Sequence, residues 1–310
     1  MTDRSRPPLA FDTISFLTDY GLKDEFVGVV KSVIRSITPE VAVIDITHDI
    51  EPHDVRAGGL ALARSVQYLA PGVVLAVVDP GVGTDRKGIV IEVANGAAYL
   101  VGPDNGLLAP AVSIVGGATG AVVLDNPEYQ LPPVGSTFDG RDVFAPAAAH
   151  LCAGVPMDAL GTRIDPSQLV PGVLPVSQTA DDGAINAEVL WVDRFGNLQL
   201  NVDPSDVDGW GEAIEVAGGR VTRTAARVDT FADVPTGSLG LMVDAYGLLT
   251  IVVDRSSAAF ELELSEGDAV TLREVEGSPS VTTSVQLGKT NVGRPTASFE
   301  NEELQCDPPS

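Results

Sequence analysis

The chain has no long apolar run and few cysteines. None of its 310 residues belongs to a hydrophobic stretch of about 18 residues, the length that a membrane helix needs. The opening segment, Met1-Thr-Asp-Arg-Ser-Arg-Pro-Pro8, has no hydrophobic region behind its charges, which argues against a secretory signal. Two isolated cysteines, Cys152 and Cys306, are too few for a disulfide framework or a zinc site. We therefore expect a cytoplasmic protein.

Basic residues are also scarce. The chain has 19 Lys and Arg against 43 Asp and Glu, a formal net charge of −24. A field of this sign repels nucleic acid and anionic membranes, so we expect neither as a partner. It is compatible with a cationic ligand, although solubility is the simpler explanation of the acidic excess.

The usual phosphate-binding and nucleophile motifs are missing. No glycine-rich loop ends in Gly-Lys-Ser/Thr, and no properly placed G-x-G-x-x-G occurs, which disfavours P-loop and dinucleotide-binding domains. No Ser or Cys stands in a nucleophile-elbow context. These motifs therefore do not indicate the reaction class.

The three histidines give a weak metal signal. The segment Thr47-His-Asp-Ile-Glu-Pro-His-Asp54 could hold a metal, but a loop in which Asp54 caps the next helix explains it better. His150 fits a partly buried histidine better than a catalytic base. We predict no metal site.

The pattern of apolar residues divides the chain into two domains. Strands alternate with helices at first, the helices at 24–37, 54–68, 105–112 and 142–151, which predicts an α/β domain with a mainly parallel sheet. Short strands separated by turns follow, which predicts a small all-β, barrel-like domain. The expected segments are a flexible N-terminus (1–12), the α/β domain (13–174), a linker (175–183), the β domain (184–275) and a disordered tail (276–310).

Three predicted strands end in an acidic, glycine-containing corner. An apolar run ends at Asp19, a second ends in Asp79-Pro-Gly-Val-Gly83, and a third ends in Gly102-Pro-Asp-Asn-Gly106. Open α/β sheets bind ligands at the carboxyl ends of their parallel strands. Arg86 follows Asp79 closely, so the corners indicate an acid-and-arginine site. The helix predicted at 142–151 is preceded by another such segment, Gly135-Ser-Thr-Phe-Asp-Gly-Arg-Asp142.

Six segments between residues 13 and 275 occur in a characteristic order. They are Phe16-Leu-Thr-Asp-Tyr-Gly21, Asp45-Ile-Thr-His-Asp-Ile50, Val78-Asp-Pro-Gly-Val-Gly83, Gly102-Pro-Asp-Asn-Gly-Leu-Leu108, Phe138-Asp-Gly-Arg-Asp142 and Phe195-Gly-Asn197. In sequence, order and spacing they resemble the S-adenosylmethionine hydroxide adenosyltransferases, relatives of the fluorinating and chlorinating S-adenosylmethionine enzymes. The resemblance implies an α/β domain, a β-barrel domain and a homotrimer with sites between subunits.

The resemblance also implies a reaction and its residues. S-Adenosylmethionine would be hydrolysed to adenosine and L-methionine by in-line attack of an activated water at ribose C5′, with no cofactor. Asp19 resembles the family's ribose-binding aspartate, and Asp79 and Arg86 resemble two members of its water-binding triad. Arginine stabilises developing hydroxide, and a carboxylate orients the water and accepts its proton.

The third member of that triad differs here. The family usually has histidine, and this chain has Asp139. Two carboxylates beside one arginine can share a proton, which raises one pKa into a useful range for a base. Alternatively, Asp139 pairs with Arg86 and leaves the water poorly activated, which would make the chain an adenosine or S-adenosylmethionine binding protein. A halogenase is the third possibility, disfavoured because two carboxylates repel halide.

The remaining substrate-binding candidates come from both domains. In the α/β domain they are His53, Asn105 and Phe138. In the β domain, Asp193, Phe195 and Asn197 match the family's positions near the methionine amino group and the adenine. Asn197 can read adenine through paired donors and acceptors, and Phe195 can stack on it. Tyr246 and Arg255 are weaker candidates, and ordinary turn chemistry is the alternative for all five.

Overall fold

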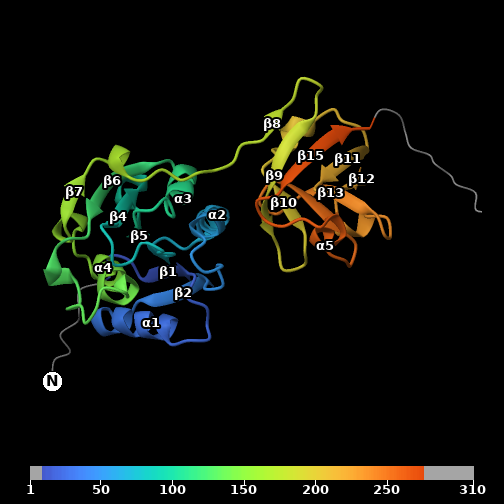
Figure 1. The fold of residues 1–310 in the computed structure, drawn as a ribbon. Helices are drawn as coiled ribbons and strands as arrows, with labels where there is room; N and C mark the ends of the chain where they lie inside the picture. The colour runs from blue at the N-terminus through green and yellow to red at the C-terminus, as the bar shows by residue number, and fades with distance from the viewer. Residues whose placement is uncertain (1–8, 276–310) are drawn as a thin grey trace, which may run out of the picture. The chain divides into compact units, whose positions relative to one another are not determined.

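The computed structural model describes residues 9–275 (Figure 1). The predicted tail, residues 276–310, lies outside the described residues, as do residues 1–8 of the predicted flexible N-terminus. Within the described part of the chain, no helix is long and apolar enough to cross a membrane. The described residues form an α/β domain followed by an all-β domain, as the sequence predicts.

A mixed sheet forms the centre of the α/β domain. Its seven strands are β1 (Thr13–Thr18), β2 (Ala42–Thr47), β3 (Val73–Val77), β4 (Gly88–Val93), β5 (Ala98–Pro103), β6 (Ala118–Val123) and β7 (Thr162–Ile164), in the order β2-β1-β3-β5-β4-β6-β7. The first four strands in this order are parallel to one another. β4, β6 and β7 extend the sheet with antiparallel pairings.

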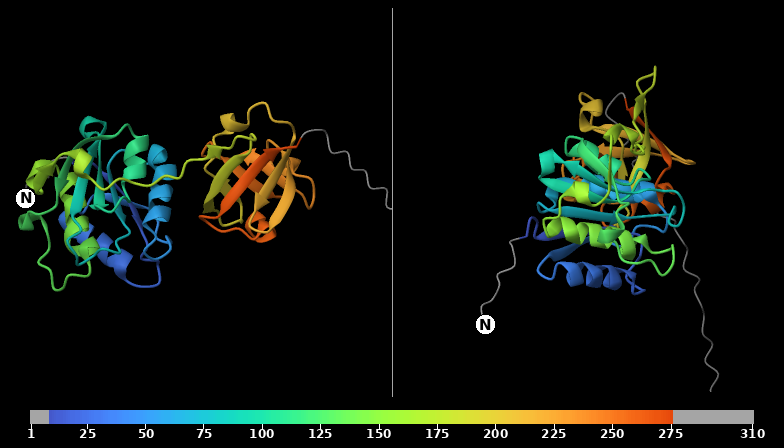
Figure 2. Two further views of the ribbon diagram at one scale, coloured as in Figure 1. Left: turned by 45° about the horizontal axis from the view of Figure 1, so that its top comes forward. Right: turned by 90° about the vertical axis from the view of Figure 1, so that its left-hand side faces the viewer.

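Helices cover both faces of this sheet, as Figures 1 and 2 show. α1 (Phe26–Ile37) and α4 (Ala145–Cys152) pack on one face, and α2 (Val55–Ser65) and α3 (Ala109–Ile114) on the other. Alternate residues of β3 enter the two cores: Val73, Leu75 and Val77 lie on one side, and Val74 and Ala76 on the other, where Val78, the residue after the strand, joins them. A strand buried on both faces reads as a continuous apolar run, which explains the run that precedes Asp79.

Capping and turn residues set the helix bounds. The Asp54 side chain accepts a hydrogen bond of 2.8 Å from the Ala57 backbone N–H, so α2 begins at Val55, as the capping interpretation predicts. The helix predicted to begin at Asn105 begins instead at Ala109. Gly106 has a φ of 93°, which holds a turn there, and Pro110 suits the first turn of a helix.

Two further features concern the joining segments. A π-helical turn, Gly140–Phe144, precedes α4 where one continuous helix from Asp142 was expected. Asn95-Gly96, a dipeptide typical of hairpin turns, joins the antiparallel strands β4 and β5, with φ of 54° at Asn95 and 87° at Gly96.

The second domain is a closed β-barrel. Its strands are β8 (Gln178–Thr179), β9 (Ile185–Val192), β10 (Leu198–Leu200), β11 (Ala213–Gly218), β12 (Val221–Arg227), β13 (Leu239–Val243), β14 (Leu249–Val253) and β15 (Ala269–Glu274). They pair in the order β10-β14-β13-β12-β11-β15-β9-β8, and an additional β10–β9 pairing closes the ring. The one α-helix in the described part of this domain is the short α5 (Ala258–Leu262). β8 lies inside the predicted linker and pairs with β9, because its backbone groups find partners along that edge.

Candidate active site

The three acidic corners meet at one edge of the sheet. β1 pairs in parallel with β3, and β3 pairs in parallel with β5. Parallel neighbours present their carboxyl ends on the same side, so the residues that follow these strands come together. Asp19 follows β1, Asp79 follows β3, and the Asp104-Asn105 corner follows β5.

A tight loop returns Arg86 to Asp79. Backbone hydrogen bonds join Val82 N–H to the Asp79 carbonyl and Thr84 N–H to the Gly81 carbonyl, both at 3.2 Å. Gly83 has a φ of 77°, and a Cβ there would lie 2.8 Å from the Ser136 carbonyl oxygen. Only glycine satisfies both conditions, which is why the turn carries its second glycine.

Arg86 holds two carboxylates at once. Its Nε donates to Asp79 Oδ1 at 2.9 Å, and its Nη2 donates to Asp79 Oδ2 and, at 2.7 Å, to Asp139 Oδ2. The Asp79 contact has the two-pronged geometry that makes Arg–carboxylate pairs strong. The exposed fractions of the side chains are 8% for Arg86, 6% for Asp79 and 27% for Asp139. Asp139 is therefore the more open of the two acids.

Burial sets the ionisation of Asp79. Loss of hydration raises the pKa of the Asp79 carboxyl above its ordinary value, and the Asp139 charge adds to this rise, while Arg86 opposes it. Two carboxylates with one arginine carry a net negative charge when all three are ionised. The cluster therefore suits a cationic substrate and can accept a proton.

A cavity of about 260 Å³ adjoins this cluster. The residues that line it include Asp19, Asp79, Asp139 and Phe138, all of them candidates from the sequence. His53 also lines it, but through a backbone arrangement that the sequence does not reveal. His53 has a left-handed φ of 71°, and its N–H donates to Asp19 Oδ2 at 2.9 Å. This bond fixes one oxygen of Asp19 and orients the carboxylate at the cavity.

Aromatic side chains form one wall of the cavity. The rings of Tyr20, Phe26 and Phe138 lie mutually close, with centroid separations of 5.7 Å for Tyr20–Phe26, 5.9 Å for Tyr20–Phe138 and 5.2 Å for Phe26–Phe138. Tyr20 and Phe26 were not singled out from the sequence. The signal for Tyr20 was its position directly after Asp19, whereas Phe26 reads as an ordinary core position of α1.

Asn105 is not among the residues that line the cavity. Its Nδ2 donates to the Val78 carbonyl at 2.9 Å, and its Oδ1 accepts from Leu107 N–H at 3.1 Å. Both ends of the amide are thus bound to backbone. The contact fixes the residue that precedes Asp79, so we expect Asn105 to act by positioning rather than by touching a ligand.

The histidines show no metal-binding arrangement. Buried His48 places Nδ1 2.9 Å from the Thr18 hydroxyl, and His150 packs edge-on against Tyr129 with ring centroids 5.0 Å apart. Burial lowers the pKa of His150. Residues 9–275 contain no group of three or more His, Cys, Asp or Glu that could hold a metal ion.

The barrel candidates Asp193, Phe195 and Asn197 share one turn. Asp193 Oδ1 accepts from the backbone N–H of Phe195 at 2.8 Å and of Asn197 at 2.9 Å, and Oδ2 accepts from Asn197 Nδ2 at 2.7 Å. Asp193 therefore holds the turn in shape. The turn buries Asn197 and leaves the Phe195 ring 77% exposed, a large apolar face available for stacking.

Tyr246 and Arg255 lie on other turns of the barrel. Asp244 Oδ1 accepts from Tyr246 N–H at 2.8 Å, and the Tyr246 ring packs edge-on against Trp191 with centroids 6.1 Å apart. Arg255 has a left-handed φ of 56° and an exposed side chain. The cavity described above is lined by residues between positions 19 and 140, so these barrel residues are not part of it.

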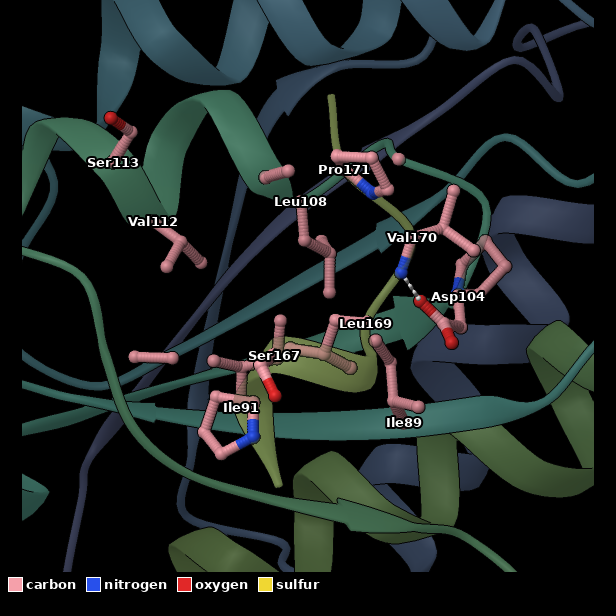
Figure 3. Close-up of a pocket in the computed structure, with 15 residues that line it drawn as sticks. Ile89, Ile91, Asp104, Leu108, Val112, Ser113, Ser167, Leu169, Val170 and Pro171 are labelled. Atoms are coloured by element: carbon pink, nitrogen blue, oxygen red, sulfur yellow. Dashed lines mark hydrogen bonds between the residues drawn. The ribbon is translucent and has the colours of Figure 1, made fainter. Parts of the chain in front are cut away.

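A second cavity in the α/β domain is larger but chemically poorer. It measures about 400 Å³ and is lined mainly by aliphatic side chains such as Ile89, Ile91 and Leu108 (Figure 3). Its carboxylate, Asp104, accepts a hydrogen bond of 2.9 Å from the Val170 N–H. The acid of the third corner thus anchors the segment after β7, so the candidate active site is the smaller, acidic cavity.

Two family models match the chain. The SAM hydroxide adenosyltransferase N-terminal domain matches residues 14–161, and the SAM hydroxide adenosyltransferase C-terminal domain matches residues 187–271. The first range contains the cavity, and the second contains most of the barrel.

Several relatives cover most of the chain. A protein named (R)-S-adenosyl-L-methionine hydrolase from Salinispora arenicola (strain CNS-205) is 44% identical over 255 residues, which cover 82% of this chain and 95% of the relative. One of the same name from Thermus thermophilus is 40% identical over 267 residues, covering 84% and 98%. A fluorinase from Actinoplanes sp. is 25% identical, covering 84% and 96%. A solved structure, an uncharacterized conserved protein from Thermotoga maritima, is 37% identical with a TM-score of 0.77, covering 84% and 99%.

Proposed function

The chain belongs to the SAM hydroxide adenosyltransferase family, and we propose that it is an enzyme that hydrolyses S-adenosyl-L-methionine to adenosine and L-methionine. The observation that carries this function is the cavity lined by Asp19 together with Asp79 and Asp139, the pair that Arg86 links. A sulfonium is a cation, and a cavity lined by three carboxylates attracts it. The relatives at 40% and 44% identity carry the hydrolase name.

The reaction is a single displacement. A water oxygen attacks ribose C5′, and the C5′–S bond breaks as its electron pair returns to sulfur. Methionine leaves as a neutral thioether, so we propose that no cofactor and no acid on the leaving group are needed. The site must hold the sugar and the water in line, which accounts for much of the rate acceleration in such reactions.

We propose that Asp139 is the base that accepts a proton from the attacking water. Both oxygens of Asp79 are bound by Arg86, whereas Asp139 uses only Oδ2 for this contact. Within the described part of the chain, Asp139 Oδ1 makes no hydrogen bond. The Asp139 side chain is also more exposed than those of Asp79 and Arg86. Asp139 can therefore accept the proton and pass it to solvent, while Arg86 stabilises the developing hydroxide.

Asp19 would hold the ribose. One of its oxygens is fixed by His53 N–H, and the other can accept from the sugar hydroxyls. Phe138 belongs to the aromatic wall beside it. This arrangement supports ribose binding next to the water site.

We further propose a homotrimer in which each site is completed by the barrel of a neighbouring subunit. The exposed Phe195 ring would stack on adenine, and buried Asn197 would read its edge. Asp193 would hold this turn, with Tyr246 and Arg255 at the margin of the site. The proposal explains why Phe195 remains 77% exposed in the single chain. We also propose a cytoplasmic location.

One observation favours a binding protein as the second candidate. The Asp139–Arg86 bond occupies part of the acid that would serve as base. Incubation of excess enzyme with S-adenosyl-L-methionine, followed by chromatography, separates the two. Hydrolysis gives equimolar adenosine and L-methionine, whereas a binding protein returns the substrate unchanged.

A further inference from the structure

One polar group beside the Arg86 cluster has no role in the reaction as derived above. Tyr20 lines the same cavity as Asp19, Asp79 and Asp139. Its hydroxyl has no hydrogen-bond partner among residues 9–275, although Arg86 and the three acids are all bonded. Tyr20 is partly buried and lines the cavity, so a hydroxyl without a protein partner there can bond a ligand or a water.

The position of the hydroxyl is fixed from several sides. The ring packs against Phe26 and Phe138, and the Tyr20 backbone N–H donates to the Thr18 hydroxyl at 3.1 Å. At the far end, a Cβ placed on Gly140 would lie 2.2 Å from the Tyr20 oxygen. The hydroxyl therefore lies close to Gly140, the residue that directly follows the proposed base Asp139.

The surrounding charges keep this group protonated. Burial raises the pKa of Tyr20, and the neighbouring charges of Asp19, Asp79 and Asp139 raise it further, more than Arg86 lowers it. The phenol therefore keeps its proton near neutral pH and can act as an O–H donor. Arg86 directs Nε and Nη2 to the two acids, so a neutral O–H donor beside them can add a hydrogen bond to the developing hydroxide that Arg86 stabilises by its charge.

We propose that Tyr20 is a further catalytic residue, whose hydroxyl hydrogen-bonds the attacking water and stabilises its oxygen as hydroxide character develops. The assignment deepens the proposed function and rests on it. No proton leaves Tyr20: the new O–C5′ bond forms, the C5′–S bond breaks toward sulfur, and the water's proton passes to Asp139. The hydroxyl acts more strongly on the transition state than on the bound substrate, so its effect falls on kcat.

The variant Tyr20→Phe tests this assignment because it removes the hydroxyl and keeps the ring. We expect kcat to fall on the order of 10- to 100-fold, with the KM, the Kd for adenosine and the Tm close to those of the wild type. Tyr129→Phe is the matched control: this partly buried tyrosine packs on His150, outside the cavity, and its loss of a hydroxyl should leave kcat unchanged.

A second variant tests the position of the Tyr20 hydroxyl. Gly140→Ala places a methyl where the Tyr20 oxygen lies, so it should lower kcat in the wild-type background. Combined with Tyr20→Phe, the same methyl meets only ring carbon and should lower kcat by a smaller factor.

The outcomes are distinct. Equal kcat for wild type and Tyr20→Phe overturns the role of Tyr20 while leaving the hydrolase intact. Weaker adenosine binding at unchanged kcat also overturns it, because the hydroxyl would then bind the substrate. Absence of adenosine from the wild-type reaction removes the proposed function, and the role of Tyr20 with it.

Discussion

Asp139 Oδ2 accepts a hydrogen bond of 2.7 Å from Nη2 of Arg86, a residue 53 positions earlier in the chain. The same nitrogen also donates to Asp79. One guanidinium thus links the loop after β3 to the π-helical turn before α4. The proposed reaction depends on this link, because it sets the distance between the acids that surround the water.

Arg86→Ala should lower kcat by roughly 10²–10³-fold, the usual effect of losing one stabilising donor, and change the Kd for adenosine little. The charge matters most as hydroxide develops. Steady-state kinetics and calorimetry measure the two quantities. Arg163→Ala is the control, since Arg163 forms an exposed pair with Asp158. A loss confined to adenosine binding would contradict the assignment.

Asp139→Ala should lower kcat by about 10²–10⁴-fold, the range expected for a positioned base. Asp139→His should retain much of the rate and add an ionisation near the ordinary histidine pKa of about 6.5. The pH dependence of kcat for the three proteins gives the comparison. A fully active alanine variant would make Asp139 a spectator and leave Asp79 and Arg86 as the water site.

The acid limb of the rate should lie above the ordinary Asp pKa of about 3.9, because burial raises the pKa of Asp79. As pH falls through this raised value, Asp79 gains a proton and loses its ionic contact with Arg86. Since the folded-state pKa exceeds the unfolded one, protonation of Asp79 itself favours the folded state. As the pH is lowered, activity should therefore fall at a higher pH than the one at which the Tm begins to fall. If activity and the Tm fell at the same pH, this order would be contradicted.

Asp19→Ala should abolish measurable adenosine binding by calorimetry. Each charge-assisted hydrogen bond to a ribose hydroxyl is worth roughly 1.5–3 kcal/mol, so loss of two lowers the affinity by at least about 100-fold. Asp24→Ala, an exposed acid near the same loop, is the control. Unchanged affinity would remove Asp19 from the site.

An experiment with mixed oligomers tests whether Asp19 and the barrel residue Phe195 of different subunits form one site. Phe195→Ala should weaken binding by the roughly 1–3 kcal/mol of a base–aromatic stack, and its exposed ring predicts little change in Tm. If each site combines Asp19 of one subunit with Phe195 of another, co-expressed Asp19→Ala and Phe195→Ala chains should form some intact sites and regain activity. Failure of mixed oligomers to recover would place both residues in one chain's site.

The sequence predicts the edge of the sheet better than the details of the cavity. Asp19 and Asp79 could be placed because an apolar run followed by an acidic corner marks the end of a buried strand. Asn105 had the same signal, yet its amide is turned to the Val78 carbonyl. The pattern places a residue at a strand end but does not say which way its side chain turns.

Contacts between residues far apart in the sequence were only partly predictable. Asp139 and Arg86 could be expected as neighbours through the family resemblance, whereas the Tyr20–Gly140 contact depends on how the loop after β1 packs against the π-helical turn. The π-helical turn has no composition signal, because Gly-Arg-Asp-Val-Phe is equally compatible with an α-helix. Such contacts are decided by tertiary packing.

Hydrolysis in water enriched in oxygen-18 tests the central claim most directly. Attack of water at C5′ predicts that the wild type forms adenosine with the heavy isotope in its 5′-hydroxyl, together with an equal amount of unlabelled L-methionine, as mass spectrometry would show. Adenosine without the label, or no adenosine from excess enzyme, would contradict the account.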